Sequence, residues 1–363
     1  MKRKVKKMRK LKVICFSFIL YITCFSIGTV AASAAESEDI GNFNFKMIRP
    51  ENQIGDTGYF NLKMKPSQKQ TVQVEMSNIT DKEVTVEIAL NSAKTNSNGV
   101  LEFGPTVFKE DASLKYNFKD IVKGPETITI PAKQKIPLNL EITMPADSYD
   151  GIITGGIQMQ VQKSKEQLEK EKKEKQIVNR YAYVLGMVLK ETDTEVKPEL
   201  EFSKFYPELA NYRNAVFVNF SNVRSEFLND MTVDMQVMKK GSDEVLYDTK
   251  KTNMRMAPNS MIDFPVEMNG ERMEPGDYTG HVLVTSGDQK WEWSNDFKIT
   301  KEDADKYNAQ DVTLVQERGF NWLLIALIAG GVILVVGLVY FVVRMTLNKK
   351  AASKKRKKKT VKK

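Results

Sequence analysis

The chain has 363 residues, with 55 Lys and Arg against 46 Asp and Glu, and its only cysteines are Cys15 and Cys24. After residue 24 the chain can therefore form no disulfide, thiol nucleophile or zinc–thiolate site. The two ends hold 19 of the basic residues and no acidic ones, so the body between them carries a formal charge of −10. This acidic body is unsuited to binding nucleic acid or another polyanion through bulk charge.

Residues 1–34 have the pattern of a secretory signal peptide. Eight basic residues in Met1–Lys12 precede an apolar run over residues 13–30, and Ala32-Ser33-Ala34 supplies a small-residue cleavage site. This order of charge, apolar run and small residues is typical of an export signal. The alternative is an uncleaved N-terminal anchor, but the position of the cleavage pattern favours removal.

Residues 320–343 predict a transmembrane helix, because they contain no charge and span about 36 Å against a hydrocarbon core of about 30 Å. Trp322 and Tyr340 lie near its ends, where amphipathic rings prefer the interface. Arg344 and a Lys-rich tail follow, so the positive-inside rule puts residues 344–363 in the cytoplasm. Nucleic-acid binding by this tail is the alternative, although a stop-transfer signal that also contacts anionic lipid explains the same residues.

The body is dominated by alternation of apolar and polar residues, which is typical of half-buried strands. Such segments recur along the chain, separated by turn dipeptides such as Asn98-Gly99 and Pro275-Gly276. Their apolar positions are Val72, Val74, Met76; Val84, Val86, Ile88, Leu90; Ile136, Leu138, Leu140, Ile142, Met144; Val216, Val218, Phe220; Val233, Met235, Val237; and Ile262, Phe264, Val266, Met268. We predict a mainly β protein with two tandem immunoglobulin-like β-sandwiches, residues 41–192 and 193–300.

A weak internal repeat supports two copies of one domain. Met76-Ser77-Asn78-Ile79 is echoed by Phe220-Ser221-Asn222-Val223, each at the end of a strand. The second copy ends in a hairpin of residues 278–285 and 291–299, and the equivalent strands of the first copy are 152–161 and 181–189. Between those, residues 163–179 are rich in good helix formers, which predicts either an inserted charged helix or a plain linker. Residues 301–319 are polar and acidic and are expected to form a stalk.

Residues suited to catalysis are scarce. His281 is the only histidine and falls inside a predicted strand, so a structural role is favoured and a Ser-His-Asp arrangement is not. No phosphate-binding glycine loop or calcium loop is present. A carboxylate pair assembled in space remains open, but we expect no enzyme activity, no cofactor and no metal.

Two polar clusters are suited to binding. Asn52, Gln53 and Tyr59 precede the first strong strand, and Lys94, Thr95 and Asn96 begin a polar loop that ends at Gly99. Aromatic rings can stack on the apolar faces of sugars while amides bond hydroxyls, so these residues are candidate glycan or partner contacts. The alternative is that the aromatic pair Tyr59-Phe60 belongs to the core and that residues 96–99 form a hairpin turn.

Several stretches resemble a known family, the cell-surface WxL-interacting proteins of Gram-positive bacteria. They include Pro50-Glu51-Asn52-Gln53, Gly58-Tyr59-Phe60, Ser113-Leu114-Lys115-Tyr116 and Gly155-Gly156-Ile157, with Tyr181-Ala182-Tyr183-Val184 in the second half. We expect the family match of the first domain to stop near residue 162 and that of the second to begin near residue 170.

The resemblance implies a non-catalytic adaptor whose first domain binds peptidoglycan. Its second domain would bind secreted WxL-domain surface proteins or host extracellular-matrix proteins, and the ectodomain would lie in the cell-wall zone of a single-pass type I membrane protein. The alternative is a pure protein–protein scaffold or adhesin subunit without direct glycan binding, using exposed strand edges or the charged insertion.

Overall fold

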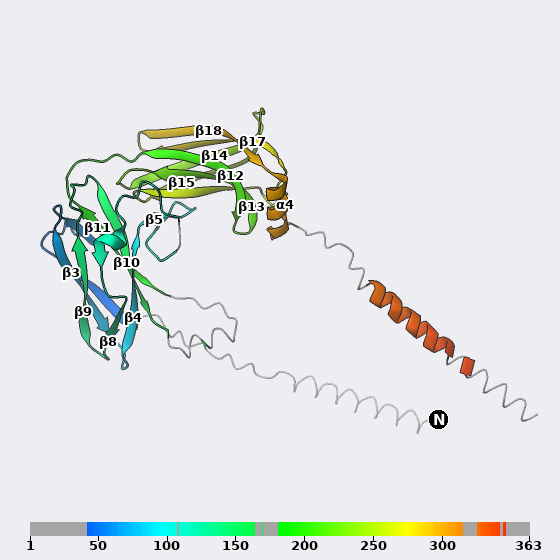
Figure 1. Cartoon of the computed structure of the whole chain (residues 1–363), viewed down its shortest axis with the longest axis horizontal. Coiled ribbons are helices and arrows are strands. Elements are labelled where there is room, and N and C mark those ends of the chain that lie inside the picture. The colour runs from blue at the N-terminus through cyan, green and yellow to red at the C-terminus, as the bar shows by residue number, and fades with distance from the viewer. Residues whose placement is uncertain are drawn as a thin grey trace, which may run out of the picture.

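The computed structural model describes residues 42–106, 109–163, 169, 181–314, 325–341, 344 and 345. Two β-sandwiches meet at an angle, with the first built from the blue to green strands and the second from the green to orange strands (Figure 1). Each encloses its own hydrophobic core. The protein is therefore mainly β, as the alternation of the sequence predicts.

The first sandwich has sheets of four and five strands. Its four-stranded sheet has the order β1 (Phe43–Ile48), β3 (Lys69–Asn78), β9 (Lys135–Thr143), β7 (Val122–Lys123). Its five-stranded sheet has the order β2 (Phe60–Lys63), β11 (Tyr183–Lys190), β10 (Ile152–Val161), β4 (Val84–Ser92), β8 (Thr127–Ile130). All neighbours are antiparallel except β2 and β11. The short helix α2 (Phe118–Ile121) and the small hairpin of β5 (Lys94–Thr95) and β6 (Leu101–Glu102) complete the domain.

The second sandwich has sheets of three and four strands. The three-stranded sheet has the order β12 (Leu200–Ala210), β13 (Arg213–Asn222), β16 (Ser260–Glu267). The four-stranded sheet has the order β15 (Val245–Met256), β14 (Leu228–Lys239), β17 (Gly276–Ser286), β18 (Gln289–Ile299). The first, second and fifth strands thus face the third, fourth, sixth and seventh, which is the arrangement of an immunoglobulin-type sandwich.

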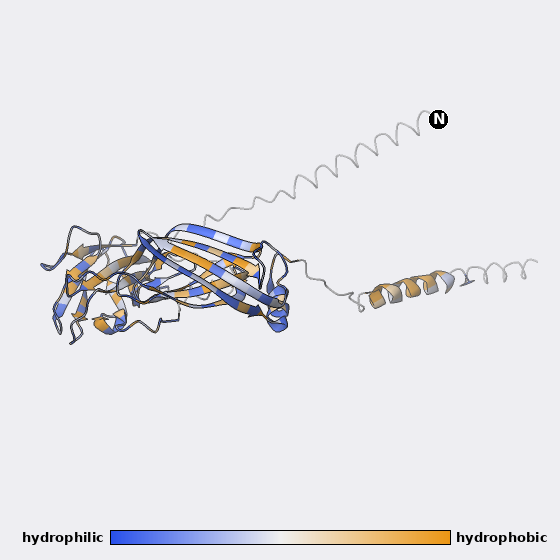
Figure 2. Cartoon of the chain, turned by 90° about the horizontal axis from the view of Figure 1, so that it is seen from above, coloured by the Kyte–Doolittle hydropathy of each residue, from blue (hydrophilic) through white to orange (hydrophobic). Residues whose placement is uncertain are grey.

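The apolar positions of the alternating segments fill the two cores. In β3, for example, Val72, Val74 and Met76 are buried while Thr71 and Gln73 are exposed. Successive side chains of a strand point to opposite faces, so each strand contributes one apolar row to the interior. Hydrophilic and hydrophobic residues are accordingly mixed along the strands of both domains (Figure 2).

The repeat noticed in the sequence has a structural cause. Asn78 at the end of β3 and Asn222 at the end of β13 are both buried. The Nδ2 of each donates to the carbonyl four residues later and to a more distant carbonyl, that of Ile130 for Asn78 and that of Ala257 for Asn222. The Oδ1 of each accepts from the backbone N–H two residues later. The same side chain therefore closes the same loop in both copies, which confirms the repeat.

Helix α4 (Lys301–Gln310) replaces the first part of the expected stalk. Thr300 caps it, because its Oγ1 accepts from the backbone N–H of Asp303 at 3.0 Å. Ala304, Tyr307 and Asn308 are buried against the second sandwich. The polar composition of this segment suggests a stalk. It does not reveal the helix, because only a few side chains on one helical face are buried.

The expectations for the two termini and the insertion fall largely outside the described residues. These include the signal peptide 1–34, Trp322, and most of the charged segment 163–179. Residues 325–341 form a helix that is mostly orange in Figure 2. Its apolar side chains and Tyr340 are exposed, and Arg344 is also helical. Within the described parts of the chain, no helix combines the length and the apolar character needed to cross a membrane.

Candidate functional site

Thr95 lies in the contact between the two sandwiches. The β5–β6 hairpin extends from the first sandwich onto β15 and β16 of the second. The Thr95 side chain is 4% exposed, its hydroxyl lies 2.7 Å from the Ser260 hydroxyl, and it accepts from the backbone N–H of Ala257 at 2.9 Å. A glycan cannot reach this buried hydroxyl, so we leave Thr95 out of the candidate binding surface.

Asn96 shapes the turn of the same hairpin. Its Oδ1 accepts from the backbone N–H groups of Asn98 and Val100, at 2.9 and 3.1 Å. Gly99 follows at a φ of +68° and lies so close to Met254 that a Cβ would be 2.5 Å from that residue's Cβ. Its carbonyl accepts from the backbone N–H of Arg255 at 2.8 Å. The Asn96 side chain therefore holds the turn that contacts the second sandwich. This agrees with the alternative prediction that residues 96–99 form a hairpin turn.

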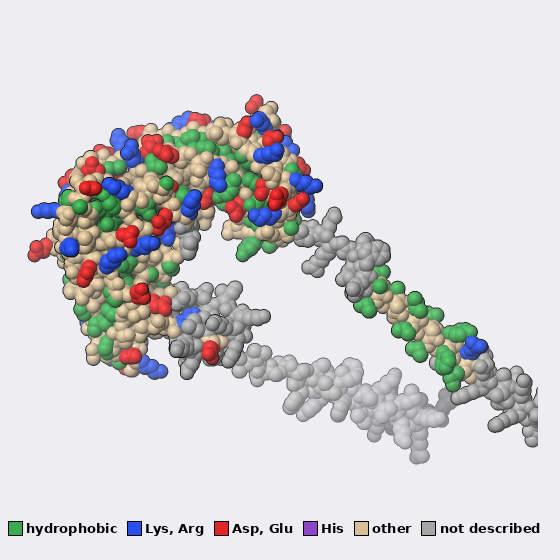
Figure 3. Space-filling view, viewed as in Figure 1, with side chains coloured by type: hydrophobic (Ala, Val, Ile, Leu, Met, Phe, Trp, Pro, Cys, Tyr) green, Lys and Arg blue, Asp and Glu red, His purple; other side chains and the backbone are tan. Residues whose placement is uncertain are grey.

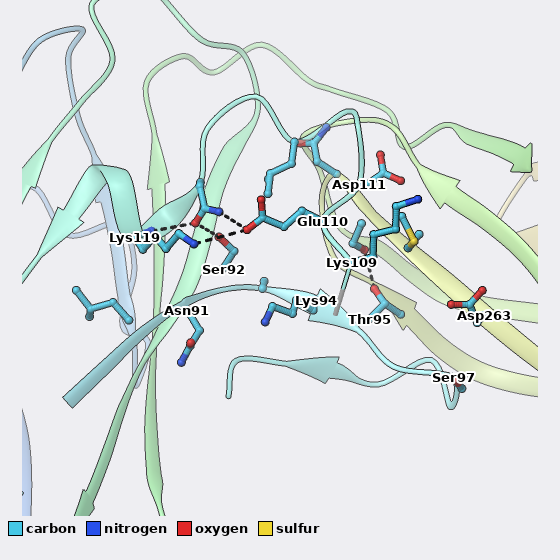
Figure 4. Close-up of a pocket in the computed structure, with 17 residues that line it drawn as sticks. Asn91, Ser92, Lys94, Thr95, Ser97, Lys109, Glu110, Asp111, Lys119 and Asp263 are labelled. Carbon is cyan, nitrogen blue, oxygen red and sulfur yellow. Dashed lines mark hydrogen bonds and ion pairs between the residues drawn. The ribbon is translucent and has the colours of Figure 1, made fainter. Parts of the chain in front are cut away.

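Lys94 lies in a small cleft between the sandwiches (Figure 4). The cleft encloses about 120 Å³, and its charged lining residues are Lys94, Lys109, Glu110, Asp111, Lys119 and Asp263. Lys94 Nζ donates to the carbonyl of Thr106 at 2.6 Å, and burial lowers the pKa of its ammonium group. The cleft has room for only a few water molecules, and its lining carries equal numbers of basic and acidic residues. It offers no nucleophile paired with a base and no room for a sugar chain.

Asn52 and Gln53 hold the loop between β1 and β2. Asn52 exchanges two amide hydrogen bonds with Gln70, at 2.8 and 3.0 Å, and donates to the carbonyl of Lys63. Gln53 donates to the hydroxyl of Thr57 and to the carbonyl of Tyr59, both at 3.0 Å. The side-chain amides of both residues are therefore hydrogen-bonded to other residues of the first sandwich. The loop that they hold exposes the ring of Tyr59.

Tyr59 borders an open groove of about 640 Å³ on the outer face of β11. Its side chain is 41% exposed, whereas the neighbouring Phe60 is fully buried in the core. Val184, Gly186 and Val188 lie along the lining, and Val100 and Phe103 from the hairpin region complete it on the first sandwich. Among the described residues, the groove therefore places the predicted candidate Tyr59 beside a space large enough for a ligand.

Two glycines in neighbouring strands make the groove possible. A Cβ on Gly186 would lie 3.5 Å from the Cβ of Tyr59, and a Cβ on Gly156 would lie 2.5 Å from the Cβ of Phe103. Because a strand glycine permits close approach of another chain segment, Phe103 can pack directly on β10. The sequence carries this signal as glycines within strand patterns, although such glycines alone do not locate a site.

The second sandwich closes the far side of the groove. Phe227, Asn253 and Arg255 line it there. The Nε of Arg255 donates to Asn229 Oδ1 at 2.7 Å, and its guanidinium carbon lies 5.4 Å from the centre of the Phe227 ring. Arg255 is the only residue of the lining that carries a charge at neutral pH. The groove is therefore aromatic and apolar with one positive end.

The described residues offer no obvious catalytic or metal site. His281 lies on β17 with its Nε2 2.9 Å from a carboxylate oxygen of Glu292 on β18, as a cross-strand pair. Within the described ranges, no group of three or more His, Cys, Asp or Glu is placed to hold a metal ion. Acidic and basic side chains are mixed over the visible face of both domains (Figure 3), which shows no single-sign patch.

Comparison with protein families identifies both sandwiches. Residues 43–161 match the domain described as "WxL Interacting Protein, peptidoglycan binding domain", and residues 172–309 match "WxL Interacting Protein, host binding domain". The chain belongs to the WxL Interacting Protein family. The second match begins before β11, although β11 pairs with β10 and β2 in the first sandwich. Both matched domains are described as binding domains.

Other comparisons add no argument about function. No curated protein matches the chain in sequence. Solved structures with a similar course of the chain include the YadV chaperone (12% identity, 71% of this chain and 100% of that one, TM-score 0.28). The class 5 fimbriae chaperone CfaA is similar to the same extent (12% identity, 69% of this chain and 99% of that one, TM-score 0.25). So is the E. coli chaperone DraB (10% identity, 71% of this chain and 96% of that one, TM-score 0.26). Scores this low support no inference from these structures.

Proposed function

We propose that this WxL Interacting Protein is a non-catalytic adaptor of the cell surface. The first sandwich binds peptidoglycan, and the second binds a surface or host protein. The observation that carries the proposal is that the two family matches fall, in this order, on two sandwiches with separate cores. Each domain can therefore present its own binding surface.

We propose that the adaptor is held in the cell membrane by residues 320–343. Residues 1–34 direct export, residues 344–363 remain in the cytoplasm, and the ectodomain lies in the cell-wall zone. The charge-free sequence of the span and the basic tail support this topology. Full-length protein should fractionate with membranes, and a chain ended at Arg318 should be released; equal release of both would contradict the anchor.

The partners that we propose for the second domain are based on the family. Secreted proteins with a WxL domain, and host extracellular-matrix proteins, are the classes that its description as a host binding domain and the family name suggest. A scaffold that contacts only proteins remains the second candidate. If crosslinked partners on intact cells persist after glycan digestion, contact with them does not depend on peptidoglycan.

Sedimentation with insoluble peptidoglycan tests the wall-binding function. The purified fragment 35–318 includes both cores and helix α4, and peptidoglycan stripped of protein and wall polymers is the probe. We expect the fragment to sediment with the peptidoglycan in a saturable manner. If the fragment stays in the supernatant under conditions that sediment a known wall binder, peptidoglycan binding by this protein is rejected.

A further inference from the structure

The groove beside Tyr59 has the shape of a binding site for an extended ligand. It is open, encloses about 640 Å³, and runs between the outer face of β11 and the second sandwich. This volume is within the range of about 300–1,000 Å³ typical of ligand sites. Gly186 carries no side chain, so it adds nothing to fill the groove beside Tyr59, whose Cβ would lie 3.5 Å from a Cβ at that position.

The groove's chemistry favours a sugar chain. Tyr59, Phe103 and Phe227 supply three aromatic rings to the lining, and an aromatic ring covers the apolar face of a pyranose well. Asn253 adds an amide that can bond sugar hydroxyls or N-acetyl groups. The hydroxyl of Thr154 is buried and donates to the carbonyl of Met187 at 3.0 Å, so it is not counted among these contacts. A purely apolar partner would cover the Asn253 amide without pairing it, which costs binding energy.

The positive charge in the groove further restricts the class of ligand that fits it. Arg255 is the only charged residue of the groove, in a body whose formal charge is −10. Its two terminal nitrogens make no hydrogen bond among the described residues, because only Nε and the backbone N–H are engaged. A guanidinium group with donors to spare suits a carboxylate. The ligand should therefore be a mostly neutral sugar chain that carries carboxylates.

We propose that this groove binds the glycan strand of peptidoglycan, with Tyr59 as the stacking platform and Arg255 as the contact for a carboxylate on the strand. The inference rests on the proposed function and makes it more specific. It also assigns glycan contacts to both matched domains. Arg255 and Phe227 lie within residues 172–309, so the region matched as the host binding domain also contributes to glycan recognition.

Three variants of the 35–318 fragment test the groove, each with a defined effect. Tyr59→Ala removes the stacking ring from the surface, and Gly186→Val places a side chain in the groove where the nearest Cβ contact is an ordinary 3.5 Å. Arg255→Met keeps the packing on Phe227 but removes the charge. Tyr181→Ala and Arg272→Met are the matched controls, because both residues are exposed and outside the groove lining.

The readout is the dissociation constant for insoluble peptidoglycan, with circular dichroism to confirm folding. We expect Tyr59→Ala and Gly186→Val to bind about tenfold more weakly, roughly the loss of one good stacking contact. Arg255→Met should weaken peptidoglycan binding by less than tenfold at low salt. At high salt, where the charge is screened, it should bind as tightly as the unmodified fragment. Both controls should match the unmodified fragment, and glycan strands freed of stem peptides should compete.

The outcomes separate this inference from the general function. If the fragment sediments and folded Tyr59→Ala and Gly186→Val sediment equally well, the groove is not the glycan site, although peptidoglycan binding stands. If soluble stem peptides compete and glycan strands do not, the assigned ligand is also wrong. If the unmodified fragment fails to sediment, the proposed function itself is rejected.

Discussion

Asp111 connects the two sandwiches through a charged group. Its Oδ1 accepts from the backbone N–H and the hydroxyl of Ser113, at 2.8 and 2.6 Å, and its Oδ2 accepts from the hydroxyl of Ser221 on β13. Burial favours the neutral acid, but these hydrogen bonds outweigh it and lower the pKa of Asp111. The folded protein therefore stabilises the ionised carboxylate at the domain contact.

The lowered pKa predicts a loss of stability in acid. The contribution of Asp111 to the free energy of unfolding is fully present above its ordinary pKa of about 3.8 and is lost as the pH falls through the lowered value. Asp111→Asn should therefore be less stable than the parent at pH 7 and lose less stability between pH 5 and acid.

Urea unfolding of the 35–318 fragment across this pH range measures both effects. Asp288→Asn is the control, since Asp288 is exposed in the β17–β18 turn. An unchanged acid dependence in Asp111→Asn would show that the carboxylate does not contribute as described.

Side chains at the junction show why the candidate residues could be predicted only in part. Asn-Gly indicates a turn, but the sequence leaves open whether the pair Tyr59-Phe60 belongs to the core, and in the structure only Phe60 does. The polar side chains of Thr95 and Asn96 are equally suited to a sugar and to another domain. The partners of Thr95, which are Ser260 and Ala257, lie more than 160 residues away in the chain, and no local pattern records that contact.

Among the elements, the strands follow directly from the sequence, but helix α4 does not. A strand of alternating residues is defined by its own pattern, whereas α4 buries only a few side chains, at positions 304, 307 and 308. That spacing of three and four is a helical face, and Thr300 followed by Asp303 resembles a capping sequence. Both signals are short, and the acidic composition of the segment obscures them.

Asn308 on α4 provides a test of how firmly this helix is attached. Its Oδ1 accepts from the backbone N–H of Met273 and from Asn214 Nδ2, both at 2.8 Å, and its Nδ2 donates to the carbonyl of Met273. Asn308→Ala removes both hydrogen bonds to the Met273 backbone and one of the two from Asn214 Nδ2, which also donates to the carbonyl of Glu271. We therefore expect a loss of about 1–3 kcal/mol in the free energy of unfolding.

Chemical denaturation of the 35–318 fragment gives that value, with Gln310→Ala as the control on the exposed side of the same helix. If the two alanine variants are equally stable, α4 is attached loosely and acts as part of a stalk after all.

On the scale of the whole molecule, the two sandwiches are joined at several separate points. Thr95 contacts Ser260, Asp111 contacts Ser221, and the backbone N–H of Ile152 donates to the carbonyl of Ser225 at 2.8 Å. These three points come from different parts of the first sandwich, so they restrain the angle between the domains (Figure 1). The groove between Tyr59 and Arg255 keeps its shape only while this angle is held.

Gly151 allows the third of these contacts. Its φ is +87°, and a Cβ there would lie 2.4 Å from the backbone carbonyl oxygen of Ser225. Gly151→Ala must therefore push the second sandwich away at this point. Gly241→Ala is a matched control, because Gly241 has a similar φ of +79° but nothing within 4 Å of the added Cβ. Both variants bear the strain of a left-handed alanine, and only Gly151→Ala disturbs the junction.

Two optical probes can report this difference. In the 35–318 fragment the only tryptophans are Trp291 and Trp293, both on β18 of the second sandwich, so their fluorescence follows that domain alone. Far-UV circular dichroism follows both domains. For the parent fragment and Gly241→Ala we expect the two denaturation curves to coincide, as they do for one cooperative unit. In Gly151→Ala they should separate, because the domains then unfold independently. Curves that still coincide, with a stability loss no greater than that of Gly241→Ala, would mean that the junction does not couple the two sandwiches.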